Sequence, residues 1–283
     1  MNILTIDVED WYHLLDNDYT KSFNEWKNFE TRIQYGLDII FSILDKYNQK
    51  ATFFFLTWLA EKHKDLVHQI LERGYEIGSQ SHYHQLVYEQ NPREFKEDLI
   101  RSIKTLEDVS GQRVKYYRAP GFSLTENNKW AFEILTQEGI EVDCSIFPAP
   151  RGHGGFPSYT SPVPSLIKYN GIEIKELPIN YTKLFGKPLI FSGGGYFRLF
   201  PYYLIKHWTK RSNYVMSYLH PRDVDPGQPM IKELPITRKF KSYVGLKNAE
   251  KKLEKWLTDF EFVDIGTAVK QIDWEKVPVV DLG

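Results

Sequence analysis

The sequence contains a single cysteine, Cys144, among 283 residues, which excludes an intrachain disulfide and is typical of a reducing compartment. No apolar run is long enough to span a bilayer, and the N-terminus lacks the basic and apolar segments of a secretory leader. We therefore expect a cytoplasmic protein with no integral membrane segment, on the assumption that no leader has been trimmed from it.

The sequence also lacks an excess of charge of either sign, because 36 Lys and Arg residues balance 37 Asp and Glu residues. No basic run is available to neutralise phosphates, so nucleic acid is not an expected partner. The sequence has no GxGxxG loop, no P-loop and no GxSxG elbow. These absences argue against dinucleotide-binding, P-loop and α/β-hydrolase proteins.

What the chain does have is alternation of strand-like and helix-like segments. A helix is predicted over 31–47, where Ile33, Leu37, Ile40 and Leu44 recur at helical spacing, and an apolar strand over 51–56. At least six such units predict an α/β fold in one domain, a barrel of parallel strands with crossover helices. We treat 1–283 as that domain, ending in a helix–strand extension at about 240–283.

Several local signals refine this prediction. Asn91-Pro92-Arg93-Glu94 is typical of a helix start, and Asn170-Gly171 predicts a tight hairpin between two strands. We expect a loop at 193–196 and a strand over 260–265.

Unusual polar residues follow five separate predicted strands: Asp7, His84, Arg118, Asp143 and His220. In a parallel barrel the carboxyl ends of the strands share one face, where such proteins carry their chemistry. We therefore expect these side chains to converge on one site.

The N-terminal strand ends in three carboxylates within four positions: Asp7, Glu9 and Asp10. Such crowding is stable when a cation, an arginine or a shared proton compensates the repulsion. The alternative is a solvated turn in which Asp10 caps a helix. Carboxylates and imidazoles suit a divalent metal such as zinc, and a second carboxylate and a separate histidine can serve as base and acid. The set predicts metal-assisted hydrolysis of an amide or ester.

The motifs Thr5–Asp10, Arg118–Gly121, Asp143–Ser145 and Leu219–His220 occur in the order found in polysaccharide deacetylases, and the chain resembles that family, carbohydrate esterase family four. Its members include chitooligosaccharide and peptidoglycan deacetylases. The chain is most similar to a branch found with exopolysaccharide and lipopolysaccharide loci. The resemblance implies an irregular (β/α)7-type barrel, zinc or another divalent ion, and hydrolysis of non-peptide C–N amide bonds in N-acetylated carbohydrates.

The resemblance also implies roles for individual residues. Asp7 would be the base, steadied by Arg118, and His220 the acid. Glu9 or Asp10 would hold the metal, and strand alternation favours Glu9. The implied substrate-binding residues are Gly121, Asp143, Leu219 and Tyr196.

One position departs from the family pattern. The second motif normally supplies two histidines four residues apart as metal ligands, but this chain has Gln80 and His84, with His82 between them. Three interpretations follow: the metal uses His82 and His84, it binds weakly through Gln80, or catalysis is weak. We favour a retained but weakened site.

Three functions therefore stand as hypotheses. The first is a metal-dependent deacetylase of N-acetylated sugars in a polysaccharide, oligosaccharide or glycolipid precursor. The second is a metal-free hydrolase of cyclic amides with the same fold. The third is a catalytically weak carbohydrate-binding relative, suggested by Gln80.

Overall fold

The computed structural model describes residues 1–15, 17, 19–20, 22–150 and 154–283. Its main element is an eight-stranded sheet in the order β12-β7-β8-β6-β5-β4-β3-β2, parallel throughout except for the antiparallel pair β7–β8. The strands are β2 (Thr5–Val8), β3 (Thr52–Phe55), β4 (Glu76–Ser79), β5 (Tyr116–Tyr117), β6 (Val142–Asp143), β7 (Ser165–Tyr169), β8 (Ile172–Glu176) and β12 (Val279–Asp281).

Parallel pairing continues beyond β2. The strand β1 (Asn2–Ile3) pairs with β11 (Val215–Met216), and bridges join Ile6 to Leu219 and Gly193 to Tyr218. Residues 215–219 therefore lie beside the N-terminal strand, although more than two hundred positions separate them in the sequence. A separate antiparallel hairpin consists of β9 (Thr182–Leu184) and β10 (Lys187–Leu189).

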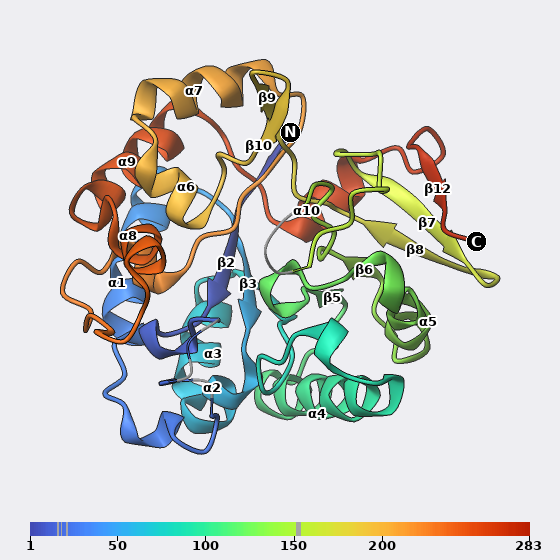
Figure 1. The fold of residues 1–283 in the computed structure, drawn as a ribbon, viewed down its shortest axis with the longest axis horizontal. Helices are drawn as coiled ribbons and strands as arrows, with labels where there is room; N and C mark the ends of the chain where they lie inside the picture. The colour runs from blue at the N-terminus through green and yellow to red at the C-terminus, as the bar shows by residue number, and fades with distance from the viewer. Residues whose placement is uncertain (16, 18, 21, 151–153) are drawn as a thin grey trace.

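Helices surround this sheet. They are α1 (Ile33–Tyr47), α2 (Thr57–Lys62), α3 (Lys64–Glu72), α4 (Pro92–Ser110), α5 (Trp130–Gln137), α6 (Gly194–Leu199), α7 (Tyr202–Arg211), α8 (Ile236–Tyr243), α9 (Leu246–Asp259) and α10 (Ile265–Gln271). Figure 1 shows α6 to α9 on one side of β2 and the strands β7, β8 and β12 on the other, so that the N-terminal strand runs through the middle of the molecule. Of the described helices, none combines the length and the apolar character needed to cross a membrane.

Strand alternation divides the core into two clusters. Phe53 and Phe55 join the large cluster beneath the helices, whereas Phe54 joins a smaller cluster with Ile3 and Cys144. Leu4, Ile6 and Val8 belong to the helix-facing cluster. Asp7 alternates with these residues, and its register partner on β3 is Phe54. The strand pattern that buries the apolar residues therefore turns Asp7 to the inner face.

Local signals account for several element boundaries. The Asn91 side chain accepts hydrogen bonds from the backbone N–H groups of Arg93 and Glu94, and Glu94 accepts one from Asn91 N. This reciprocal capping starts α4, as predicted. At the tip of the β7–β8 hairpin, Asn170 and Gly171 both have positive φ angles, 45° and 80°, which the predicted tight turn requires.

Two local predictions are wrong. The expected loop at 193–196 is instead the start of α6, which begins at Gly194. Gly194 has a φ of 50°, a conformation that glycine adopts readily. The expected strand over 260–265 is reduced to a bridge between Val263 and Ile3, because Asp264 caps α10 with a hydrogen bond to Thr267 N. The C-terminal segment still adds a strand, since β12 pairs with β7.

Candidate active site

Asp7 lies between a guanidinium and an imidazole at the carboxyl end of β2. Arg118 Nη1 is 2.6 Å from Asp7 Oδ1, and His220 Nε2 is 3.9 Å from Asp7 Oδ2. The backbone fixes this arrangement, because Asp7 N donates to Leu219 O at 2.8 Å. Residues predicted from three distant segments therefore meet at one carboxylate.

Arg118 is held on several sides. Its Nη1 donates to Thr5 Oγ1 at 2.7 Å, its Nε donates to Cys144 O at 3.3 Å, and its guanidinium lies 4.3 Å from the ring centre of Phe54. Burial raises the pKa of Asp7, and the positive charge of Arg118 opposes that rise. The arginine therefore favours the ionised carboxylate that a base requires.

Glu9 forms a second polar cluster next to Asp7. Glu9 Oε1 lies 2.9 Å from His84 Nε2 and accepts a 2.6 Å hydrogen bond from Gln80 Nε2. Burial would raise the pKa of Glu9, but the adjacent His84 outweighs it and lowers the value to about 2. Glu9 is thus an ionised acceptor in a buried place.

The two clusters meet in a group that could hold a metal ion. One ligand atom from each of Asp7, Glu9 and His220 lies within 4.8 Å of the others. Gln80 Oε1 is buried without a hydrogen-bond partner, which is costly unless something binds it. Carboxylate oxygens, an imidazole nitrogen and a free amide oxygen are all donors to divalent cations. The donor types around Glu9 therefore fit a divalent metal. Asp7 and His220 lie close enough to share one with Glu9, and His84 Nε2 contacts Glu9 directly.

His220 is fixed by a carboxylate three residues further along the chain. Its Nδ1 lies 2.8 Å from Asp223 Oδ2, and its side chain is 19% exposed. Burial alone would lower the pKa of His220, but Asp223 outweighs it and raises the value to about 9. The imidazole is accordingly protonated near neutral pH, with Nε2 directed toward Asp7.

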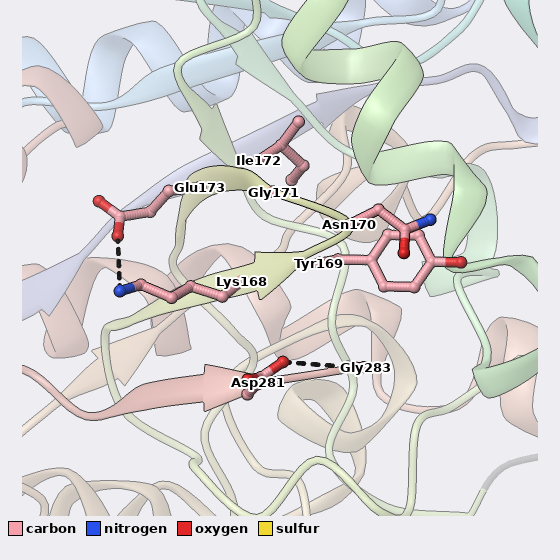
Figure 2. Close-up of a pocket in the computed structure, with 8 residues that line it drawn as sticks. All are labelled: Lys168, Tyr169, Asn170, Gly171, Ile172, Glu173, Asp281 and Gly283. Atoms are coloured by element: carbon pink, nitrogen blue, oxygen red, sulfur yellow. Dashed lines mark hydrogen bonds and ion pairs between the residues drawn. The ribbon is translucent and has the colours of Figure 1, made fainter.

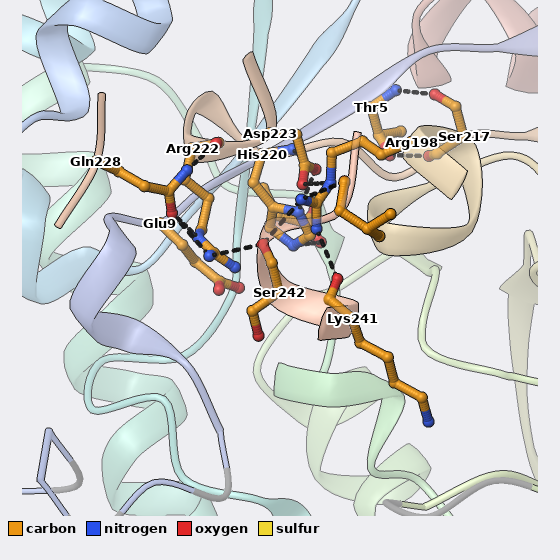
Figure 3. A network of polar contacts seen from close by, with 12 residues as sticks. Thr5, Glu9, Arg198, Ser217, His220, Arg222, Asp223, Gln228, Lys241 and Ser242 are labelled. Atoms are coloured by element: carbon orange, nitrogen blue, oxygen red, sulfur yellow. Dashed lines mark hydrogen bonds and ion pairs between the residues drawn. The ribbon is translucent and has the colours of Figure 1, made fainter. Parts of the chain in front are cut away.

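Two arginines lie behind His220, as Figure 3 shows. Arg198 Nε is 3.0 Å from Asp223 Oδ1. Arg222 donates from Nε and Nη2 to Gln228 Oε1 at 3.0 and 2.7 Å. Burial, aided by the nearby Arg198, lowers the pKa of Arg222 to about 10. Two buried arginines therefore lie close to His220, one paired with Asp223 and the other held by Gln228.

Two predicted ligands have other partners. Asp10 caps a short helix, η1 (Trp11–His13), and its oxygens also accept hydrogen bonds from Thr31 Oγ1 and Arg32 N at 2.6 and 2.8 Å. His82 Nδ1 lies 2.8 Å from Thr57 Oγ1, and its Nε2 is 3.4 Å from Glu61. Neither side chain belongs to the group formed by Asp7, Glu9 and His220.

Asp143 lies in the interior, fully buried. Ser145 Oγ donates to Asp143 Oδ1 at 2.5 Å, and Glu176, also fully buried, makes a side-chain hydrogen bond with Asp143. Burial raises the pKa of Asp143 to about 6 and the pKa of Glu176 far above its usual value. Burial therefore favours the protonated form of both carboxyl groups.

The other predicted substrate-binding residues lie at different depths. Leu219 is buried beside β2, and Gly121 lies in the short helix η4 (Pro120–Phe122), directly after Arg118 and Ala119. Tyr196 is 42% exposed on α6, where its ring stacks with Phe200. Of these three, Tyr196 is the most open to a ligand from solvent.

Sequence reasoning assigned no role to Asp223, Arg198 or Glu176, and it favoured a structural role for His13. His13 Nδ1 accepts a hydrogen bond from Asp10 N at 2.9 Å, and burial lowers the pKa of His13 well below its usual value. Asp223 could have been found, because a polar residue followed three positions later by a carboxylate is a capping pattern. Glu176 carries no such signal.

A hollow of about 520 Å³ lies elsewhere, at the tip of the β7–β8 hairpin and the C-terminus (Figure 2). Its lining includes Lys168, Glu173 and Asp281, and Lys168 pairs with Glu173 at 3.6 Å. None of the active-site residues described above contributes to it.

Two family profiles divide the chain between them. One, described as polysaccharide deacetylase, matches residues 29–141, and the other, described as a domain of unknown function (DUF3473), matches residues 144–270. Residues 29–141 therefore match the polysaccharide deacetylase family. The predicted resemblance to carbohydrate esterase family four is thereby confirmed.

Curated relatives of this family match part of the chain. A peptidoglycan-N-acetylglucosamine deacetylase of Bacillus cereus is 36% identical over 104 residues, covering 35% of this chain and 38% of the relative. A peptidoglycan deacetylase of Helicobacter pylori is 22% identical over 124 residues, covering 44% and 40%. The chain thus matches about two fifths of the length of each relative.

Solved structures similar to the whole chain establish the fold. A putative polysaccharide deacetylase from Mycobacterium smegmatis has a TM-score of 0.65 at 19% identity, over 98% of this chain and 91% of that one. Puue allantoinase has a TM-score of 0.59 at 14% identity, over 95% and 88%. A family-four pseudoenzyme from Bacillus anthracis has a TM-score of 0.53 at 13% identity, over 98% and 69%. The predicted α/β fold of the (β/α)7-barrel type is confirmed.

Proposed function

We propose that this protein is a metal-dependent hydrolase that removes acetyl groups from N-acetylated sugars of a polysaccharide, oligosaccharide or glycolipid precursor. The observation that carries the proposal is the position of Asp7, which lies between Arg118 and His220. A carboxylate held ionised by an arginine is a base, and a protonated imidazole is an acid. The two side chains lie close enough to act on the same substrate group, since His220 Nε2 is 3.9 Å from Asp7 Oδ2.

Asp7 accepts the proton of the attacking water, and Arg118 keeps the carboxylate oriented toward it. His220 then donates the proton at Nε2 to the leaving nitrogen of the sugar. A backbone N–H near Gly121 stabilises the oxyanion of the acetyl carbonyl. The products are acetate and a free amine.

A divalent cation, with zinc as the first candidate, would supply the Lewis acidity that activates water and the acetyl carbonyl at neutral pH. Glu9 and His84 would hold it, because their side chains are in contact. Asp7 and His220 then stay free to act as base and acid, and Gln80 would be a weaker third ligand. In this interpretation Asp10 and His82 are structural. A cation held by Glu9 would compete with the hydrogen bond that Glu9 accepts from Gln80 Nε2.

The activities of the relatives support the substrate class. Two of them are peptidoglycan deacetylases, one of these acting on N-acetylglucosamine. A family-four pseudoenzyme is also similar in fold, and a variant of it is described as having restored enzymatic activity. Gln80 therefore favours a second candidate function, a carbohydrate-binding relative with little turnover.

Acetate release tests these candidates. We expect purified protein to release acetate from N-acetylchitopentaose or peptidoglycan fragments when zinc, cobalt or manganese is supplied, and to stop when a chelator is added. Binding of these glycans without acetate release, with any of the ions, would select the second candidate. Activity that a chelator leaves unchanged would favour the metal-free cyclic-amide hydrolase instead.

A further inference from the structure

The Asp223 carboxylate holds both the backbone and the ring of His220. His220 directly precedes a short helix, η6 (Pro221–Val224), and Asp223 is the third residue of that helix. Asp223 Oδ2 accepts hydrogen bonds from His220 N at 2.9 Å and from His220 Nδ1 at 2.8 Å. In return, Asp223 N donates to His220 O at 2.8 Å. Three contacts thus fix the imidazole relative to its own backbone.

Arg198, on α6, holds the other oxygen of this carboxylate. Its Nε lies 3.0 Å from Asp223 Oδ1, and both side chains are almost fully buried. Its Nη1 and Nη2 donate to the carbonyl oxygens of Ser242 and Lys241 at 2.8 and 3.1 Å. The guanidinium is therefore anchored to the end of α8, and Asp223 is held from behind (Figure 3).

The other buried carboxylate near a strand end, Asp143, does not serve His220. Asp143 bonds with Ser145 and Glu176, and no hydrogen bond or ion pair joins it to His220 in the described part of the chain. Within that same part, the carboxylate in direct contact with His220 Nδ1 is Asp223.

We propose that Asp223, held by Arg198, is the positioning residue of His220, and that the segment of unknown function, residues 144–270, contributes the acid together with the two residues that fix it. Both residues, like His220, fall within 144–270, whereas Asp7, Glu9, Gln80, His84 and Arg118 all precede it. By accepting the Nδ1 hydrogen, Asp223 directs Nε2 toward Asp7 and the leaving nitrogen. The expected effect of Asp223 on turnover rests on the proposed deacetylase function. The positioning of the His220 ring by Asp223 does not depend on that function.

The test compares Asp223→Asn with Asp225→Asn. Asp225 is a matched control, because it is a buried carboxylate in the same turn that pairs with Arg32 at 2.5 Å and, in the described part of the chain, makes no hydrogen bond or ion pair with His220. We expect Asp223→Asn to lower kcat for acetate release from N-acetylchitopentaose by roughly 100-fold with little change in KM. We expect Asp225→Asn to keep kcat within about twofold, and Asp223→Glu to recover part of the loss, because each retains a carboxylate for Nδ1.

A second measurement does not depend on turnover. In 15N-labelled protein, the Nδ1 proton of His220 should give an exchange-protected resonance, assigned by its loss in His220→Gln. The proposal requires that Asp223→Asn abolishes this resonance and that Asp225→Asn retains it. A resonance that survives in Asp223→Asn, or equal losses of kcat in both variants, would overturn it. If the wild type releases no acetate, the proposed function fails and the resonance alone decides the role of Asp223.

Discussion

The two segments that meet at Asp7 are organised in different ways. Residues up to 141 place their groups on consecutive parallel strands, so Asp7 and Arg118 arrive from β2 and from the end of β5. Residues from 144 onward place His220 and Asp223 in one tight turn, where a single carboxylate holds the imidazole. The first arrangement depends on the sheet and the second on local hydrogen bonds. A substitution in the turn should therefore disturb the positions of both His220 and Asp223. A substitution on one strand should disturb only the group that this strand carries.

The largest expected effect is at the carboxylate where the two segments meet. Asp7→Asn should lower kcat by roughly 1000-fold, because an amide cannot accept the proton of water. Acetate release from N-acetylchitopentaose measures the loss, and circular dichroism checks that the fold remains. Turnover within about tenfold of the wild type would remove Asp7 from the role of base.

Glu9 and Asp10, two neighbouring carboxylates of the first segment, are expected to have different roles, one in metal binding and the other in stability. Glu9→Gln should weaken binding of zinc or cobalt by about 100-fold or more, because a charged ligand is lost. Asp10→Asn should leave that affinity unchanged and cost about 1–3 kcal/mol of stability, because the cap and its bonds to Thr31 and Arg32 weaken. Calorimetric metal titration and thermal unfolding separate the two. The opposite assignment of effects would make Asp10 the ligand.

The turn in the second segment predicts a pH dependence of stability. The pKa of His220 is raised to about 9, so its contribution is complete below its unfolded value of about 6.5 and is lost as pH rises through 9. The pKa of Asp223 is lowered by Arg198 and His220 against the effect of burial, so its contribution is complete above about 4 and is lost in acid.

The pair should therefore stabilise the fold most between about pH 4 and 6.5, and on the order of 3 kcal/mol should be lost between pH 6.5 and 10. Denaturant unfolding of the wild type and of His220→Gln, both without metal, measures this difference. Equal pH profiles for the two proteins would show that His220 gains no stabilising partner on folding.

A smaller effect is expected at Gln80. Gln80→His replaces a neutral amide with an imidazole beside Glu9, so metal affinity should rise by about tenfold or more. Gln80→Asn, which keeps an amide but shortens it, is the matched control and should not gain affinity. A histidine variant that binds metal no better than the wild type would argue against a cation at Glu9 and His84.

The sequence predicted those parts of the site that follow from sheet topology. Asp7, Arg118 and His220 could be brought together because parallel strand ends share one face, and alternation favoured Glu9. The partners of Asp10, Asp143 and His82 depend on the packing of distant side chains such as Thr31, Glu176 and Thr57. No spacing rule reports those contacts. The start of α6 at Gly194 was also missed, because glycine-rich sequence ordinarily indicates a loop.

A single shared site is tested most directly by comparing Asp7→Asn, His220→Gln and the double variant in acetate release. Groups that act as one unit do not give multiplicative losses. We predict that the double variant loses no more than about the larger of the two single losses. Losses that multiply, as for independent positions, would contradict the convergence of the two segments on one reaction.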